Sequence, residues 1–485
     1  MPPRLALCLA LVATGSSVAL ANLSVSNYAS IQEALDRNPG RMVFVPAGDH
    51  VVTAAIRLRH DRSGLWGPGR IVAANPAEAI VVIESRHEVQ LLDLTLTRPE
   101  GKQETHRPGI FVNRSREVTI GNVRLLDNRG DLASIYLRSS LDVRIRDCLV
   151  ENYSRISVDD RRRRPDVPNF DVVGGYAFRC ISGNGIGVRA CGRVSLQGNR
   201  IIERIMIPTP ELKATHQLGS FVHRDAQKGT GLSQQAWDAG YNNAWHQGSA
   251  IVLANVGTDP LVQTNPFVPR EEDPVDGPGI DENFQVIGNY IENAPQGMDI
   301  HVDHVVVANN IVVNAFMGMK AVHGARNVAI IGNQFSRSSL WGILLMPGTT
   351  SREAQPAADG RAARPANIDG HTIVANNIVS DFGYGDARWM WQNNETAPLH
   401  FNANGFDPNM PPLRQVIVNG NVVHDAGRDG ILIAGRPRVE PPRYRYAVRI
   451  NAGQGGPRDL LFADNLFSPG TEGVSNVPLT GEARQ

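Results

Sequence analysis

The sequence predicts an all-β fold in which short strands stack in parallel as the successive rungs of a solenoid. One observation is a repeat in the middle of the chain, where an asparagine ends each run of alternating apolar residues. These asparagines are Asn289, Asn310 and Asn333, at spacings of 21 and 23 residues. A second observation is the alternating run that follows each of them, led by Gly297, Gly318 or Gly342. Units this short cannot bury an apolar face alone, so they must stack on one another.

The same turn recurs on both sides of this central region. Its asparagine or aspartate residues are Asn122, Asp147, Asn199, Asn377, Asn421 and Asn465. Asparagine tolerates the left-handed backbone of tight turns, and its amide can bond the equivalent amide in the next rung. We therefore expect these residues to be structural, and the repeat to extend through most of the chain.

The N-terminal residues have the pattern of an export signal. Arg4 precedes an apolar run over 5–13, and Ala19-Leu20-Ala21 has the small-x-small pattern of a cleavage site. This pattern predicts a signal peptide over 1–21 and a secreted or periplasmic mature protein. No later stretch stays apolar for the roughly 18 residues that a membrane span needs, so we expect no membrane insertion.

A short helix and a strand follow this signal. Ile31, Ala34 and Leu35 have helical spacing, and residues 42–48 form a strand that runs into a tight turn. A helix here would cover the open end of a solenoid. The Ile-Gln-x-Ala-Leu helix, the Val-Pro-x-Gly strand and the asparagine turns together resemble the pectate-lyase superfamily over roughly 28–470. That resemblance implies a right-handed parallel β-helix with an N-terminal capping helix.

The repeat and the resemblance divide the chain into four parts. These are a signal peptide (1–21), an N-terminal cap with the first strands (22–70), a parallel β-helix with loop insertions (71–470) and a C-terminal tail (471–485). The expected insertions are 155–170, 205–247, 255–282, 348–367, 384–397, 404–414 and 436–457. If the strands stack as predicted, the insertions border one sheet and leave a groove along it.

Charge and aromatic content indicate the kind of partner. The 48 basic and 48 acidic side chains cancel, which gives no electrostatic case for nucleic acid. Trp245, Trp389 and Trp391 lie in the insertions of a chain that has few aromatic residues elsewhere. Such rings can stack on a polysaccharide or oligosaccharide, or they can anchor their own loops. The sequence does not predict an oligomeric state.

Three cysteines remain after the signal peptide. Export permits a disulfide, and Cys180 with Cys191 is the candidate pair across a short turn. Cys148 lies in an apolar strand, where a buried free thiol is expected. The odd number of cysteines leaves the pairing open.

Period-two alternation separates the core from the outer face on the glycine-led strands. Met298 and Ile300 should face the core, whereas Asp299, His301 and Asp303 should face outward.

One repeat later the outward position belongs to Lys320. In-register strands lie about 4.8 Å apart, so Lys320 and Asp299 should touch. Lysine is rare in this chain, with four lysines against forty-four arginines, and lysine differs from arginine in that it can lose its proton. The pair is therefore a candidate for chemistry, and a solvated surface ion pair is the alternative.

Other polar residues occupy comparable places. His400 and Asn402 should face outward on a later strand, Arg189 takes the matching outward place upstream, and His323 ends the strand that carries Lys320. We expect Arg189, His323 and Asn402, together with the three tryptophans, to bind substrate.

These residues fit β-elimination of a uronic-acid polysaccharide. That reaction needs a neutralised carboxylate, a base for the neighbouring proton and an acid for the leaving oxygen. Lys320 would be the base, Asp299 would tune it or hold Ca²⁺ together with Asp303, and His301 or His400 would neutralise charge or donate the proton. Asp299 favours the charged form of Lys320, which opposes a role as base unless Ca²⁺ neutralises that carboxylate.

Two other functions stay open. A glycoside hydrolase or a fructan-type transferase would use two carboxylates, for which Asp299 and Asp303 are available. A non-catalytic β-helix that binds glycans or surfaces is the third possibility. The superfamily contains lyases, hydrolases, epimerases, transferases, phage tailspikes and non-catalytic proteins, so the resemblance alone does not choose among them.

Overall fold

The computed structural model describes most of the chain. The described residues are 23–130, 132–161, 176–224, 246–254, 281–348, 350–357, 363, 365–387, 396–402, 410–425, 432–433, 436–437, 441–451 and 456–481. The predicted signal peptide, over 1–21, lies outside them. No helix among the described residues is long and apolar enough to cross a membrane.

Three parallel sheets of 12 strands each form the body of the molecule. Sheet 1 comprises β1 (Met42–Phe44), β4 (Gly64–Trp66), β7 (Gln90–Leu92), β11 (Thr119–Gly121), β15 (Arg144–Arg146), β20 (Ser195–Gln197), β24 (Glu282–Ile287), β27 (Asp303–Ala308), β30 (Arg326–Ile331), β33 (Gly370–Ala375), β36 (Arg414–Asn419) and β41 (Arg458–Ala463). Sheet 2 comprises β2 (Asp49–Val52), β5 (Arg70–Ala73), β8 (Thr95–Thr97), β12 (Arg124–Leu126), β16 (Leu149–Glu151), β21 (Arg200–Ile202), β25 (Tyr290–Glu292), β28 (Ile311–Val313), β31 (Gln334–Ser336), β34 (Ile378–Ser380), β37 (Val422–His424) and β42 (Leu466–Phe467). Sheet 3 comprises β3 (Ile56–Leu58), β6 (Val81–Glu84), β10 (Ile110–Asn113), β14 (Ile135–Arg138), β19 (Ile186–Arg189), β23 (Ser249–Ala254), β26 (Gln296–Ile300), β29 (Met317–Ala321), β32 (Trp341–Leu345), β35 (Ala397–Asn402), β40 (Tyr446–Asn451) and β43 (Gly473–Ser475).

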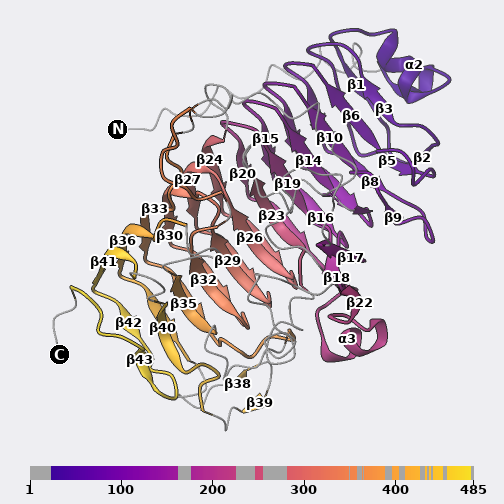
Figure 1. Ribbon diagram of the computed structural model, residues 1–485. Helices are drawn as coiled ribbons and strands as arrows, with labels where there is room; N and C mark the ends of the chain where they lie inside the picture. Colours follow the sequence, from indigo (N-terminus) through magenta and orange to yellow (C-terminus); the bar gives the residue numbers. More distant parts are fainter. Residues whose placement is uncertain are drawn as a thin grey trace, which may run out of the picture.

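The chain visits the three sheets in turn, so one strand from each makes a rung. Figure 1 shows the rungs following one another from the indigo N-terminal end to the yellow C-terminal end. The inward side chains of all three sheets form one continuous apolar core, which includes Met298, Ile300, Met319, Leu399 and Phe401. This arrangement confirms the predicted parallel β-helix and the predicted inward face of the glycine-led strands.

A ladder of asparagines, all buried except the partly buried Asn465, joins the rungs at the turn between sheets 1 and 2. Its members are Asn199, Asn289, Asn310, Asn333, Asn377, Asn421 and Asn465. The Asn310 Oδ1 accepts from both the backbone N–H and the side-chain amide of Asn289, each at 2.9 Å. The Asn310 amide in turn donates to the Val286 carbonyl and to Asn333 Oδ1, each at 2.8 Å. The predicted structural role of these asparagines is confirmed.

Asn122 and Asp147 belong to a different position of the same turn. Both have left-handed backbone, with φ of 51° and 57°, as do Gly288 and Asn309 one residue before their ladder asparagines. The ladder position beside Asp147 is Cys148, whose N–H donates to Asn199 Oδ1 at 3.1 Å. The turn therefore divides its two tasks between adjacent residues: one adopts left-handed backbone, and the next carries the ladder amide.

The glycines that lead the strands of sheet 3 are needed because the backbone passes close to its neighbours. A Cβ at Gly318 would lie 2.3 Å from the Gly342 carbonyl oxygen and 2.7 Å from the Phe335 ring. The chain turns from sheet 2 into sheet 3 at this point, and any side chain would collide with the core.

A helix covers the N-terminal end of the solenoid, and the strand stacking continues to β43 at the other end. Helix α2 (Ile31–Asp36) follows the 3-10 turn η1 (Val25–Asn27) and lies at the N-terminal end of the rungs (Figure 1). It buries Ile31, Ala34 and Leu35, as predicted, and the Gln32 side chain bonds both backbone groups of Arg57 in β3. At the other end β43 pairs with β40, so the stacking reaches into the segment expected to be a tail.

Smaller elements project from the rungs. They are β9 (Glu104–Thr105) with β13 (Arg129–Gly130), the antiparallel sheet of β17 (Arg155–Arg161), β18 (Tyr176–Ser182) and β22 (Phe221–Arg224), helix α3 (Pro210–His216), and the pair β38 (Leu432–Ile433) and β39 (Arg436–Pro437). A buried ion pair between Arg129 and Glu203, at 3.2 Å, lies at the base of the antiparallel sheet. Glu203 also accepts the backbone N–H of Ser154.

The candidate Cys180–Cys191 disulfide does not form, because the two residues lie in different parts of the fold. Cys180 lies in β18 of the projecting sheet, where its sulfur is 3.8 Å from the Ser157 hydroxyl. Cys191 follows β19 and packs in the core, with its sulfur accepting the Ser140 N–H at 3.3 Å. No disulfide joins Cys148, Cys180 and Cys191, which are all buried, and burial raises the pKa of the Cys191 thiol to about 12.

We expect Asn310→Ala to lower the free energy of unfolding by about 3–5 kcal/mol, because it strands the Asn289 donors and the Val286 carbonyl in the core. Urea unfolding followed by circular dichroism measures this difference. The matched control is Asn309→Gly, since the equivalent residues in the adjacent rungs are Gly288 and Gly332. It should change stability by less than about 0.5 kcal/mol. An Asn310→Ala protein as stable as this control would contradict a stabilising role for the asparagine ladder.

Candidate functional site

Two neighbouring strands of sheet 3 position the pair predicted from the sequence. β26 and β29 pair in parallel with Asp299 opposite Lys320. The same outward column continues through Leu344 and His400 on the C-terminal side, and through Val252 on the N-terminal side. Asp299 and Lys320 are therefore a charged island between apolar neighbours, and their predicted contact is confirmed.

Asp299 is the centre of this island. Its Oδ2 lies 3.1 Å from Lys320 Nζ, and its Oδ1 accepts from His301 Nε2 at 2.6 Å. The side chain of Lys320 is 20% exposed, against 10% for Asp299 and 5% for His301. Lys320 is thus the member of the group that a large substrate can reach, and the other two lie behind it.

The neighbouring charges determine the ionisation of Asp299. Burial alone would raise the pKa of Asp299, but the charges of His301 and Lys320 outweigh burial and hold that pKa well below its usual range. The hydrogen bond from His301 acts in the same direction. Asp299 is consequently a permanent anion at neutral pH and cannot serve as a general acid.

His323 extends the group at the end of β29. Its ring meets the ring of His301 edge to face, with centroids 4.6 Å apart. The turn that follows is fastened by Asp369, whose carboxylate accepts the N–H groups of Gly324 and Ala325 at 3.0 and 3.1 Å. Thr350 also donates its hydroxyl to the His323 carbonyl. The cluster of Asp299, His301, Lys320 and His323 is the candidate functional site.

His400 lies apart from this cluster. It shares the column of Lys320, but Leu344 intervenes, which places it two strand spacings away, about 10 Å. It is fully buried, and the Trp341 ring meets it edge to face with centroids 6.0 Å apart. In this arrangement His400 offers no surface to a substrate.

The remaining predicted residues fall into three groups. Arg189 is the last residue of β19, and Asn402 is the last residue of β35. Both lie in the column of His301 rather than in that of Lys320. Asp303 lies around the corner in β27 of sheet 1, where it pairs with Arg326 and Asn327. Trp245, Trp389 and Trp391 lie outside the described residues.

The two carboxylates expected to hold Ca²⁺ already hold protein cations. Asp299 is bonded on both oxygens by His301 and Lys320, and Asp303 by Arg326 and Asn327. They also belong to different sheets. Within the described residues no three His, Cys, Asp or Glu side chains gather as metal ligands. Asp299 and Asp303 as arranged do not fit a shared Ca²⁺ site.

Sequence reasoning missed Asp369 and Thr350, which hold the turn after Lys320. Both lie in or beyond an insertion, so no repeat spacing aligns them with the strands that they contact. Their burial is the structural signal of this role, because Asp369 is 1% exposed.

Asp369 should give the protein a distinctive pH dependence. Burial raises the pKa of Asp369 to about 7, although hydrogen bonds from Ser351, Gly324 and Ala325 favour its charged form. A folded-state pKa above the unfolded one means that the contribution to stability is present below about pH 4 and is lost as pH rises through about 7. Relative to Asp369→Asn, the wild type should lose on the order of 1 kcal/mol of unfolding free energy per pH unit in that window.

The control is Asp299→Asn, because the pKa of Asp299 is shifted in the direction opposite to that of Asp369. The pKa of Asp299 is lowered, so its contribution is present above about pH 4 and is lost as pH falls further. Urea unfolding across this range measures both differences. Parallel pH profiles for the wild type and Asp369→Asn would contradict the assignment.

Comparisons with known proteins agree with this architecture. No family model matches the chain, and no curated protein sequence matches it. Among solved structures, an exopolygalacturonase from Thermotoga maritima aligns with a TM-score of 0.51 and 11% identity, over 92% of this chain and 91% of that one. A mannuronan C-5 epimerase A-module from Azotobacter vinelandii gives 0.40 and 11%, over 94% and 98%. The tailspike of Escherichia coli bacteriophage HK620 gives 0.48 and 12%, over 93% of this chain and 59% of that one.

At such low identity these likenesses show the fold alone. Together with the three parallel sheets, the likeness to the exopolygalacturonase shows that the chain has a right-handed parallel β-helix fold.

Proposed function

We propose that this protein is an exported carbohydrate-active enzyme that cleaves a uronic-acid-containing glycan by β-elimination at Lys320. The observation that carries the proposal is the charged island of sheet 3. A partly exposed lysine is bonded to a buried aspartate, which is bonded in turn to a buried histidine. Costly buried charges of this kind, on an outer face flanked by apolar neighbours, are typical of functional sites.

Lys320 must be able to release its proton to act as a base. A lone Asp299 would oppose this, because an anion stabilises the ammonium form. However, Asp299 lies closer to His301, at 2.6 Å, than to Lys320, at 3.1 Å. When His301 carries a proton, it neutralises Asp299, which weakens the hold of Asp299 on the lysine proton. His301 is therefore a positioning and charge-balancing residue behind Lys320.

The elimination can then proceed with one proton carrier. The neutral Lys320 amine takes the proton from C5 of the uronate, and the electron pair of the C5–H bond forms the C4=C5 double bond. The C4–O4 bond breaks, and the ammonium of Lys320 returns the proton to the leaving O4. The proton lost from carbon ends on oxygen, so no external acid is consumed. His400 is not required, which agrees with its full burial.

The uronate carboxylate needs a cation during this reaction. We assign this role to His323, which lies beside His301, because Arg189 lies three strand spacings from Lys320, about 14 Å along the solenoid. A requirement for Ca²⁺ is a separate question, which a chelator can answer directly.

We expect Lys320→Ala to lower the rate of elimination by at least about 100-fold, the usual contribution of a general base. The assay follows the ultraviolet absorbance of the new double bond together with reducing ends, on uronic and neutral glycans, with Ca²⁺ or with chelator. Lys320→Arg should be as inactive as Lys320→Ala if Lys320 is the base, since arginine keeps its charge but does not release its proton. Lys102→Ala, at an exposed lysine in a loop, is the matched control and should keep full activity.

Other results would point to other functions. Reducing ends without the absorbance would contradict elimination and favour a hydrolase or transferase that uses Asp299 with a second carboxylate. Full activity in Lys320→Arg would make Lys320 a charge neutraliser rather than a base. Binding without cleavage of any glycan would favour the non-catalytic role.

A further inference from the structure

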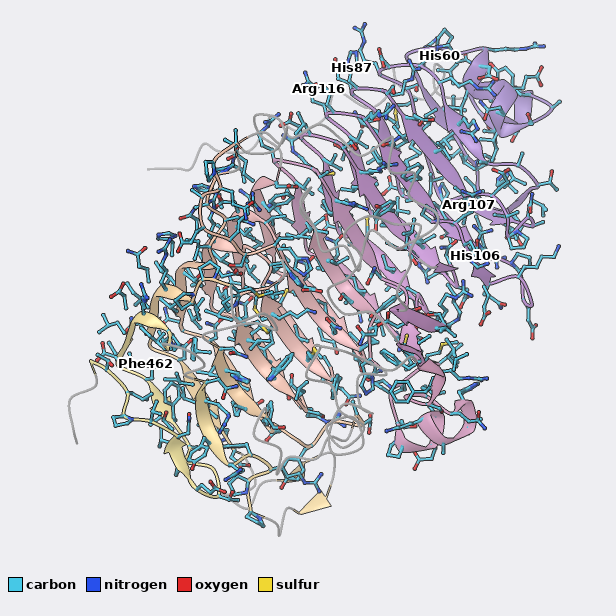
Figure 2. All side chains as sticks on the ribbon, in the orientation of Figure 1. His60, His87, His106, Arg107, Arg116 and Phe462 are labelled. Carbon is cyan, nitrogen blue, oxygen red and sulfur yellow. The ribbon has the colours of Figure 1, made fainter. Side chains whose placement is uncertain are left out.

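The corner between sheet 3 and sheet 1 is built in one way on successive N-terminal rungs. Figure 2 shows His60, His87 and Arg116, which belong to this corner, following one another along one margin of the molecule. The first residue after each strand of sheet 3 here has left-handed backbone. These residues are Ser85, Arg114, Ser139 and Ala190, with φ of 53°, 49°, 51° and 51°. The corner therefore repeats the same backbone turn from rung to rung.

Uncharged side chains hold this repeated corner. The backbone N–H of Arg86 donates to Ser115 Oγ at 3.1 Å. On the next rungs the N–H of Ser115 donates to Ser140 Oγ at 3.1 Å, and that of Ser140 to Cys191 Sγ at 3.3 Å. A hydroxyl or a thiol from the following rung is thus sufficient to satisfy the N–H that follows the left-handed residue.

The corner after Lys320 uses a carboxylate in place of these neutral groups. His323 occupies the matching place, one residue beyond the column that contains His301, and has φ of 62°. The N–H of Gly324 donates to both oxygens of Asp369 at 3.0 Å, and the N–H of Ala325 donates to one of them at 3.1 Å. The acceptor at this rung comes from a distant part of the chain and not from the next strand of sheet 3.

This substitution is costly. Asp369 is 1% exposed, and burial raises the pKa of Asp369 to about 7 because the charged form is hard to accommodate away from water. A serine or a cysteine meets the same need on the N-terminal rungs without that cost. A buried ionisable group at the rung that carries Lys320 therefore indicates a task beyond closing the corner.

The contacts around this corner fix the backbone of His323. The hydroxyl of Thr350 donates to the His323 carbonyl, and Asp369 accepts the N–H of Gly324 from the same peptide group. That peptide group is bonded at both ends, so the direction in which the His323 side chain leaves the backbone is fixed.

The imidazole ring of His323 is confined as well. A Cβ at Gly348 would lie 2.2 Å from Nδ1 and 2.6 Å from Cγ of that ring, so only glycine fits against it. The ring of His301 lies on another side, with centroids 4.6 Å apart. The ring of His323 can therefore change place only if one of these neighbours moves.

We infer that Asp369 is a positioning residue for His323, and that it keeps the imidazole where it meets the carboxylate of a uronate bound at Lys320. The inference rests on the proposed function for the role of His323. Asp369 is buried behind the turn and acts only through His323. Its loss should therefore weaken recognition of the uronate carboxylate and leave the base in place.

The test combines nuclear magnetic resonance with steady-state kinetics at about pH 8, where Asp369 is ionised. Asp369→Asn should shift the ring C–H resonances of His323, which the His323→Gln variant identifies. It should also lower kcat/KM by about tenfold on polygalacturonate or polymannuronate, whichever the wild type cleaves, the loss of one contact to a charged group. Gly348→Ala, which displaces the ring from another side, should have the same two effects.

A double variant and a matched control separate positioning from general destabilisation. Asp369→Asn in the His323→Gln background should lower kcat/KM no further, since the effect passes through that ring. Ser140→Ala removes an acceptor from the equivalent corner, four strand spacings from Lys320, about 19 Å along the solenoid. This control should lower stability and leave kcat/KM unchanged.

Unchanged His323 resonances in folded Asp369→Asn and Gly348→Ala would overturn the positioning role, whatever the activity. A further loss in the double variant, or an equal loss in Ser140→Ala, would overturn an effect through His323. Shifted resonances with full activity would overturn the contact with the carboxylate. Shifted resonances in a protein whose wild type cleaves neither polymer would support the positioning role and refute the proposed function. Since Gly348→Ala leaves Asp369 in place, the test stands even if Asp369→Asn fails to fold.

Discussion

The in-register parallel pairing of the rungs is the constraint on which the rest of the structure depends. Each strand repeats the direction and register of the one before it, so an outward residue must stand directly over its equivalent in the previous rung. The ladder from Asn199 to Asn465 fixes that register from inside the turn, because each amide bonds both the backbone and the side chain of the adjacent rung. A slip by one residue would break the ladder and would also turn Asp299 and Lys320 into the core. The fold and the site are therefore determined by the same hydrogen bonds.

This constraint makes the charged island possible and also makes it costly. Asp299 is withdrawn from water, and it stays ionised only because His301 and Lys320 bond its two oxygens. The apolar column members Val252 and Leu344 flank the pair. His323 closes the group from the end of β29, and Asp369 holds the turn that places His323. Regular strands thus position Asp299 and Lys320, and the loop contact made by Asp369 positions only His323.

The outer face of sheet 3 divides into two chemically different regions. Around Lys320 it offers a lysine and an aspartate between the apolar neighbours Val252 and Leu344, whereas toward the N-terminus Phe111 stacks on Tyr136 beside a column that contains Arg138 and Arg189. A single rigid sheet keeps the two at a constant separation, since every strand between them is paired on both sides.

The sequence by itself determined the features that repeat. The alternation of Met298, Asp299 and Ile300 predicts which side chains face the core, and the shared spacing predicts that Asp299 meets Lys320; the structure agrees with both. Features that depend on non-repeating contacts were decided only by the tertiary structure. Cys180 and Cys191 are near in sequence but lie in different parts of the fold, Asp303 turns the corner into sheet 1, and His400 is covered beside Trp341. Asp369 reaches the turn after His323 from 45 residues away. Periodicity encodes contacts between equivalent positions, whereas corners, insertions and burial depend on how the whole chain packs.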